Sequence, residues 1–268
     1  MAALQIPDSF SEIFGLGAPI AIYSAKKTSR WGSLILMLVL FAGAGGALLW
    51  GAYNAYTRYL RFGPAIVVSS LAGPWILAVV LFVIALFVSW NAFSNWKKAA
   101  VVYQDGLAYR DRKGLRAWHW NEFLSLTSAV TKHYTNGIYT GTTHFYTFLN
   151  KDGEKIEIND TIINVEELSD RIRKNIFPRI YEECAQAYNQ DRACIFGPVR
   201  LSKASGIQIG KKVYPWDEVE QVAIQKGTLS IKKRGGGWFS GASAVASAIP
   251  NLEVLLMIID QVVGLKTG

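Results

Sequence analysis

The sequence predicts an α+β membrane protein in which two N-terminal transmembrane helices precede two units of short strands, each closed by a helix. Three observations predict this class: two long runs without charge near the N-terminus, alternating apolar and polar residues after residue 97, and two later segments with helical periodicity. Apolar residues make up 51% of the 268 residues and charged residues only 18%, which excludes a disordered chain. Two cysteines are too few for a disulfide scaffold.

Residues 1–30 form an N-terminal segment. Apolar residues at Phe10, Ile13 and Leu16 indicate a short interfacial helix that ends near Gly17 and Pro19. A weakly ordered tail and an adaptor peptide for a partner are the alternative interpretations.

Residues 31–96 predict a transmembrane hairpin. An α-helix rises about 1.5 Å per residue, so about 20 apolar residues cross a hydrocarbon core about 30 Å thick. The charge-free stretches Gly32–Tyr53 and Ile66–Ala92 are both long enough. Aromatic residues flank them, as is typical of membrane interfaces: Trp31, Trp50, Tyr53, Tyr56, Tyr59, Trp90, Phe93 and Trp96.

Two other interpretations of these stretches are disfavoured. Buried helices of a soluble protein rarely lack charge over such lengths. A signal peptide would begin earlier and have a shorter apolar core, whereas the first stretch follows Asp8 and Glu12. Gly43, Gly45 and Gly46 predict close helix packing, either with the second span or with a helix of another protein. Neither span carries an ionisable residue, which argues against an ion pathway or a transporter core.

Basic residues predict that both termini lie inside the cell. They cluster before the first span and after the second, and fewer lie in the loop: Lys26, Lys27 and Arg30 before, Lys97 and Lys98 after, Arg58 and Arg61 between. The C-terminal portion would then face the cytoplasm. Cys184 and Cys194 would stay reduced there, as buried structural residues.

Residues 97–192 predict a first unit of about six strands and a long helix. Turn pairs at Asp105-Gly106 and Asn136-Gly137 separate segments that alternate apolar and polar residues. Apolar residues then recur every three to four positions from Val165 to Tyr188, which indicates an amphipathic helix. Pro178 predicts a kink or a break within it.

Residues 193–268 predict a second unit, with about five visible strands and a closing helix from Pro250. A weak internal repeat links the two units. Asp105-Gly106-Leu107 precedes Trp120-Asn121-Glu122-Phe123, just as Ser205-Gly206-Ile207 precedes Trp216-Asp217-Glu218-Val219. We interpret each repeat as a strand whose Trp faces the core and whose Glu lies at a turn.

This arrangement resembles the pleckstrin-homology (PH)-like domains of bacterial membrane proteins, in which helical hairpins tether a small β-barrel capped by a C-terminal helix. The residues that carry the resemblance are Gly206-Ile207, Pro215-Trp216-Asp217-Glu218-Val219, Gly227-Thr228-Leu229-Ser230-Ile231 and the helix from Pro250. It covers Lys97–Gly268 at the level of architecture. The second unit has fewer visible strands than the pattern, so it is either truncated or shares a sheet with the first. Most such families have no assigned activity, so the resemblance implies a binding or scaffold role.

Two basic clusters are the candidate ligand-binding residues. The first is Arg110, Arg112, Lys113 and Arg116, and the second is Lys232, Lys233 and Arg234 with Trp238 and Phe239. PH domains that bind phosphoinositides use basic residues in the loop where the first cluster lies, so the resemblance implies a lipid headgroup there. In the second cluster, cations beside aromatic residues are typical of loops that touch a membrane surface. The alternative for the first cluster is a solvated turn held near an anionic membrane, and for the second cluster it is a loop whose Trp238 folds back onto the barrel.

No catalytic, cofactor or metal motif occurs in the sequence, so we expect a protein that is not an enzyme. The three histidines, His119, His133 and His144, lie among strand residues with aromatic neighbours, which favours ordinary half-buried imidazoles over a zinc site. The net charge of +8 suits an anionic membrane surface, but no basic run is long enough to predict nucleic-acid binding.

We therefore expect a membrane-anchored, non-enzymatic interaction module that binds a protein, a peptide or a lipid headgroup at the cytoplasmic face. The alternative is a subunit or assembly factor of a larger membrane complex, whose other helices would pack against the two spans.

Overall fold

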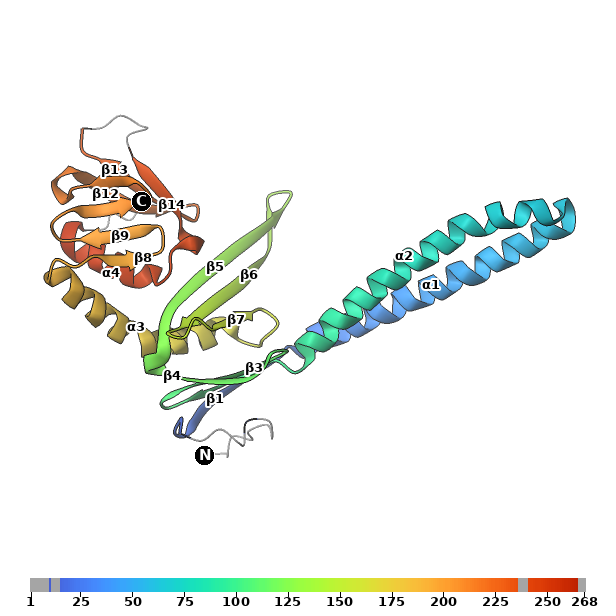
Figure 1. The fold of residues 1–268 in the computed structure, drawn as a ribbon, viewed down its shortest axis with the longest axis horizontal. Helices are drawn as coiled ribbons and strands as arrows, with labels where there is room; N and C mark the ends of the chain where they lie inside the picture. The colour runs from blue at the N-terminus through green and yellow to red at the C-terminus, as the bar shows by residue number, and fades with distance from the viewer. Residues whose placement is uncertain (1–9, 11–14, 236–240, 265–268) are drawn as a thin grey trace.

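The computed structural model describes residues 10, 15–235 and 241–264. It is a mixed α+β structure in which two long helices extend away from a body of four small sheets and two further helices (Figure 1). The prediction of a mixed α+β chain with two long apolar helices near its N-terminus is confirmed.

The two long helices form an antiparallel hairpin. Helix α1 (Lys27–Phe62) and helix α2 (Val67–Trp96) are joined by a short turn at Pro64–Ile66. Small residues line their contact, so the backbones approach closely: Ala44, Ala47, Gly51 and Ala55 on α1, and Ser70, Pro74, Ala78, Ala85 and Ala92 on α2. The large apolar side chains point outward instead, and only 11% and 17% of the most apolar stretches are buried.

The hairpin is an insertion between two paired strands. Strand β1 (Pro19–Ser24) pairs antiparallel with β2 (Ala99–Tyr103), on the far side of both helices. The alternative of a weakly ordered tail up to Arg30 is therefore wrong for residues 19–24, whereas the interfacial helix was expected to end before them. Phe10 and Leu16 pack against this sheet beside Val101.

The first unit contains seven strands rather than six, because β1 joins it. Its first sheet has the order β1-β2-β3-β4, with β3 (Gly106–Asp111) and β4 (Gly114–His119). Its second sheet contains β5 (Phe123–Thr135), β6 (Ile138–Asn150) and β7 (Lys155–Asn159). Helix α3 (Val165–Asn189) follows and runs unbroken through Pro178.

The second unit also contains seven strands, so it is neither truncated nor part of the first unit's sheets. Strands β8 (Cys194–Phe196), β9 (Val199–Ser202), β10 (Gly206–Ile209) and β11 (Lys212–Tyr214) form one sheet. Strands β12 (Val219–Gln225), β13 (Thr228–Lys233) and β14 (Ala242–Val245) form the other. Helix α4 (Leu252–Val263) closes the unit.

The two units repeat one order of elements: four strands, a 3₁₀ turn, three strands and a helix. The repeated Trp residues have matching contacts. The indole N–H of Trp120 donates to the Gln104 carbonyl (2.8 Å), and that of Trp216 to the Ser202 carbonyl (3.0 Å). Both open a 3₁₀ turn, so the expectation of a strand position is wrong. Both indoles nevertheless pack half-buried against the core, and Glu122 and Glu218 lie in the turns, as expected.

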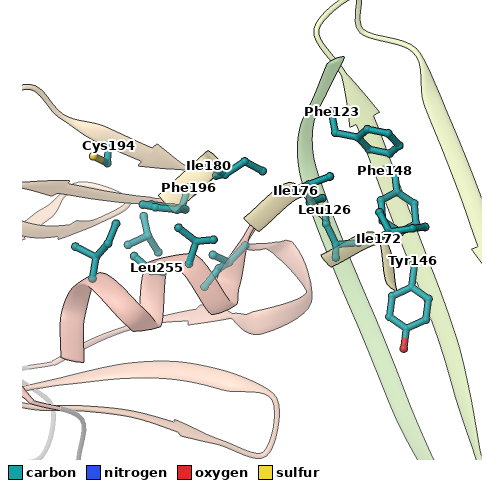
Figure 2. Packing of buried hydrophobic residues seen from close by; sticks show 14 of the residues in the cluster. Phe123, Leu126, Tyr146, Phe148, Ile172, Ile176, Ile180, Cys194, Phe196 and Leu255 are labelled. Carbon is teal, nitrogen blue, oxygen red and sulfur yellow. The ribbon is translucent and has the colours of Figure 1, made fainter. Parts of the chain in front are cut away.

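The units are not closed barrels, because no strand pairing joins the two sheets of a unit among the described residues. Helix α3 instead links both units into one core. Figure 2 shows Ile172 beside the aromatic side chains of β6, and Ile180 beside Phe196 of β8. Arg173 on α3 also pairs with Glu253 on α4 (3.5 Å).

Candidate functional site

The first basic cluster lies at the foot of the helical hairpin. Strand β2 follows α2 directly, and β3 pairs with β2 so that Arg110 is opposite Ala99. The turn between β3 and β4 therefore lies against the last turns of α2. There the Arg112 guanidinium stacks over the Trp90 ring, 4.1 Å from its centroid.

This turn has a defined local structure. The Asp111 carboxylate accepts a hydrogen bond from the Lys113 backbone N–H at 2.8 Å. Gly114 adopts a φ of 116°, which favours glycine over residues with a side chain. Asp111 also pairs with Arg116, so its negative charge is neutralised from the strand side and Arg112 is left facing α2.

A cavity of about 680 Å³, which we call the junction pocket, lies between the β3–β4 turn and α2. One wall is aromatic, with Phe93 and Trp96, and the opposite wall is basic, with Arg110 and Arg112. Its lining residues are Phe93, Ser94, Trp96, Lys97, Arg110, Asp111, Arg112 and Gly114. Three cations thus face a single carboxylate.

The junction pocket has unpaired positive charge. Within the described part of the chain, no ion pair involves Lys97, Arg110 or Arg112. Burial lowers the pKa of the neighbouring Lys98 ammonium, an effect that Asp111 and Glu157 partly oppose. Such a site favours an anion that can accept several charge-assisted hydrogen bonds.

Arg116 occupies a different position from the rest of its cluster. It pairs with Asp111, donates to the Lys155 carbonyl and lies over the Tyr109 ring at 5.7 Å. Arg116 therefore links the two sheets of the first unit and does not line the junction pocket. Lys113, next to the pocket on the same turn, is exposed.

The second basic cluster is on the other unit, away from the hairpin, where β13 lies in Figure 1. Lys232 pairs with Glu220 (2.6 Å) and Lys233 with Glu218 (2.9 Å), so two of its charges are locally balanced. Arg234 donates its backbone N–H to the Glu218 carbonyl. Trp238 and Phe239 lie outside the described residues. The fold does not bring the two clusters together.

The histidines also lie apart. The His144 ring lies between two carboxylates: its Nδ1 is 3.1 Å from Asp160, and its Nε2 is 2.9 Å from Glu166. No group of three His, Cys, Asp or Glu side chains with metal-binding geometry occurs in the residues that the structure describes.

The sequence predicted the basic side of the junction pocket but not its aromatic side. Trp90, Phe93 and Trp96 were expected to mark a membrane interface, and Lys97 to set orientation. Phe93, Trp96 and Lys97 line one pocket, and Trp90 stacks on Arg112 beside it, because β3 follows β2 closely and folds back toward α2. In the sequence, the Asp105-Gly106 turn pair was the local pattern that indicated a tight reversal between β2 and β3.

The fold and site define a mixed α+β protein in which two exposed apolar helices meet a cationic and aromatic pocket at their base. The chain belongs to a family of proteins of unknown function, DUF6585, whose sequence profile matches residues 9–266. A comparison with curated proteins gives no match.

Proposed function

We propose that α1 and α2 anchor the chain in a membrane and that the remainder is a non-enzymatic binding module at its cytoplasmic face. In this proposal the junction pocket binds the phosphate of an anionic lipid headgroup. The observation that carries the proposal is the position of three unpaired cations, Lys97, Arg110 and Arg112, at the foot of an apolar helix.

The exposed surface of the hairpin supports membrane insertion. Leu49 is 74% exposed and Phe87 is 73% exposed, although both are large and apolar. A soluble protein would bury such residues, whereas a bilayer covers them. Helix α1 has 36 residues and is therefore about 54 Å long, which exceeds the hydrocarbon thickness of about 30 Å.

The pairing of β1 with β2 supports one orientation for the whole soluble part. Because the two strands are neighbours, both ends of an inserted hairpin must lie on the same side of the membrane. The Lys and Arg residues next to these ends favour the cytoplasmic side.

The order of elements supports a PH-like classification. Each unit has seven short strands and then a closing helix; the strands followed by a closing helix agree with the PH-like resemblance, although the sheets remain open. A tethered module of this kind works at high effective concentration near its ligand, so weak contacts suffice.

The chemistry of the junction pocket fits a lipid phosphate. Arginine binds phosphate oxygens through two parallel N–H donors, and a cation near an anionic leaflet contributes about 1 kcal/mol. Trp96 and Trp90 suit the headgroup level because their rings are apolar and their N–H groups are polar.

Titration of short-chain lipids tests this proposal. The full chain in uncharged maltoside micelles is titrated with dioctanoyl phosphatidylglycerol, or with dioctanoyl phosphatidylcholine as the neutral comparison. Replacing both arginines, Arg110→Gln and Arg112→Gln, removes about 2 kcal/mol and should weaken binding of the anionic lipid about 30-fold.

A matched variant removes two exposed cations from the second unit, Lys203→Gln and Lys211→Gln. It should bind like the wild type. Equal affinity of the wild type for both lipids, or an equal loss in both double variants, would contradict the proposal.

The alternative, a subunit of a larger membrane complex, has one observation in its favour. Gly45 and Gly46 have open space where a side chain would project, so they do not serve the contact between α1 and α2. A helix of another protein would fit closely there. Retention of a partner protein by the wild type, and its loss on Gly46→Leu, would support this second function.

A further inference from the structure

Strands β5 and β6 form a two-stranded ribbon that projects beyond the first unit. Strand β7 pairs only with Phe145–Leu149, and His144 contacts Asp160 and Glu166, so the six residues of β6 from Ile138 to Thr143 pair with no strand except β5. At about 3.3 Å per residue, the free ribbon is about 20 Å long. Isolated two-stranded ribbons are marginally stable in water, so a surface that covers this one would stabilise it.

The free end of the ribbon carries exposed apolar side chains. Ile138 is 71% exposed, Tyr134 61%, Tyr139 55% and Val130 52%. The rings of Tyr134 and Tyr139 contact each other edge to face, with centroids 5.9 Å apart. They form one aromatic patch next to the turn at Asn136-Gly137.

The charge of the ribbon suits a lipid surface. Lys132 is the only charged residue between Ala129 and Phe145, and no acidic residue occurs there. Tyrosine is enriched at the headgroup level of membranes because its ring is apolar and its hydroxyl is polar. A long lysine side chain can lie along the same surface with its ammonium at the lipid phosphates.

The direction of the ribbon also fits. In Figure 1 its free end points toward the side of the molecule from which α1 and α2 extend. A membrane crossed by those helices would therefore meet the ribbon before the second unit.

We propose that the tip of the β5–β6 ribbon, with Tyr134, Ile138 and Tyr139, inserts into the headgroup region of the membrane that holds α1 and α2. This inference rests on the proposed membrane anchoring, but not on lipid binding in the junction pocket. The ribbon would be a second contact that fixes how the module is oriented over the bilayer. A second copy of the chain is the other occupant to test, because β5 and β6 have unpaired edges in this region.

Site-specific fluorescence tests the proposal on the full chain in nanodiscs of phosphatidylcholine and phosphatidylglycerol. A Cys184→Ala, Cys194→Ala background receives a single cysteine carrying an environment-sensitive dye. The three positions are Ile138 at the tip, Leu49 on α1 and Val213 on the second unit, all at least half-exposed. Spin-labelled lipids with the quencher at headgroup depth or deep in the acyl chains locate each dye.

The expected result is a blue-shifted emission for the dye at residue 138, strongly reduced by the headgroup-level quencher. The dye at 49 should be reduced by the deep quencher, and the dye at 213 by neither. Adding Tyr134→Ser and Tyr139→Ser should return the dye at 138 to the emission of the dye at 213.

Two outcomes overturn the proposal. If the dye at 49 is quenched but the dye at 138 behaves like that at 213, the helices insert and the ribbon does not. If the dye at 138 is shielded only in discs that hold two copies, and lipid quenchers have no effect, the ribbon binds a second chain. Lack of quenching at 49 would instead refute the membrane anchoring itself.

Discussion

Asn251 connects the two units through hydrogen bonds, and its replacement should weaken their contact. It precedes α4 and is buried. Its backbone N–H donates to the Leu126 carbonyl (2.7 Å), its Oδ1 accepts from the Leu126 N–H (2.8 Å), and its Nδ2 donates to the Leu124 carbonyl (3.2 Å). The backbone and side chain of this one residue thus satisfy three polar backbone groups of β5, at Leu124 and Leu126.

The magnitude of Asn251→Ala follows from two terms. The Leu126 N–H is left buried without a partner, which costs about 1–3 kcal/mol. Asn251 also has a φ of 52°, a left-handed conformation that costs a residue such as alanine about 1–2 kcal/mol. The sum is about 2–5 kcal/mol, and 2 kcal/mol already corresponds to about 30-fold in an equilibrium constant.

Hydrogen exchange measures this effect directly. In the full chain in detergent micelles, amides near Leu126 should exchange at least about 30-fold faster in the Asn251→Ala variant. Asn251→Gly should avoid the part of the stability loss that comes from the left-handed backbone conformation, because glycine accepts a positive φ.

The repeat supplies a matched control. Asn164 precedes α3 with nearly the same φ, 51°, but it is exposed and makes no capping hydrogen bond. Asn164→Ala should therefore leave exchange near Leu126 unchanged. Unchanged exchange in Asn251→Ala, or an equal increase in Asn164→Ala, would refute the assigned role.

Three further predictions concern packing and pH. Gly51→Leu should lower the thermal stability of the hairpin by several kcal/mol, because even a Cβ there would lie 2.8 Å from the Pro74 side chain. Thermal unfolding followed by circular dichroism measures this loss of stability. Gly206→Ala should destabilise the second unit by more than about 2 kcal/mol in urea unfolding, because its Cβ would lie 2.1 Å from the Tyr214 carbonyl oxygen at a φ of 87°. Burial and the hydrogen bond donated to Glu167 raise the pKa of Tyr23 to about 12. The stability that the Tyr23 hydroxyl contributes is therefore complete below about pH 10 and disappears as the pH rises to about 12. Tyr23→Phe should remove that part of the pH dependence of unfolding.

Two other glycines serve as controls, because they test whether any substitution of a glycine in the same helix or unit is destabilising. Gly45 has open space around it, so Gly45→Leu should leave the hairpin stable in micelles. Gly210 has a positive φ of 59° but no nearby atoms, so Gly210→Ala should destabilise less than Gly206→Ala. For Tyr23, identical pH profiles of the wild type and the phenylalanine variant between pH 10 and 12 would refute the prediction.

The local features of the fold were predictable from the sequence. The two charge-free stretches identify the long helices because a helix depends on neighbouring residues. The repeated Trp120 and Trp216 positions each open a 3₁₀ turn, because the Trp-x-Glu part of the motif is a local signal.

The non-local features were not predictable. Strand β1 has six residues, and its partner β2 follows only after both helices, so no local pattern links them. Gly197 turns the chain at a φ of 59° inside a segment that reads as one strand, which hides the β8–β9 pair. Whether two sheets close into a barrel depends on pairing between distant edges, and here that pairing is missing from the described strands.

The insertion of a hairpin between paired strands fixes the base of the helices to the sheet. Neighbouring strands lie about 4.8 Å apart, whereas packed helices lie about 8–10 Å apart, so the chain must diverge between them. The Ala25 N–H still donates to the Lys98 carbonyl (3.1 Å), which continues the strand pairing up to the helices. Arg30 then donates to the Trp96 carbonyl (2.7 Å) and stacks on the Trp96 ring. A tilt of the helices would break these contacts and would also move Trp96 relative to the β3–β4 turn, so the shape of the junction pocket depends on the angle between hairpin and sheet.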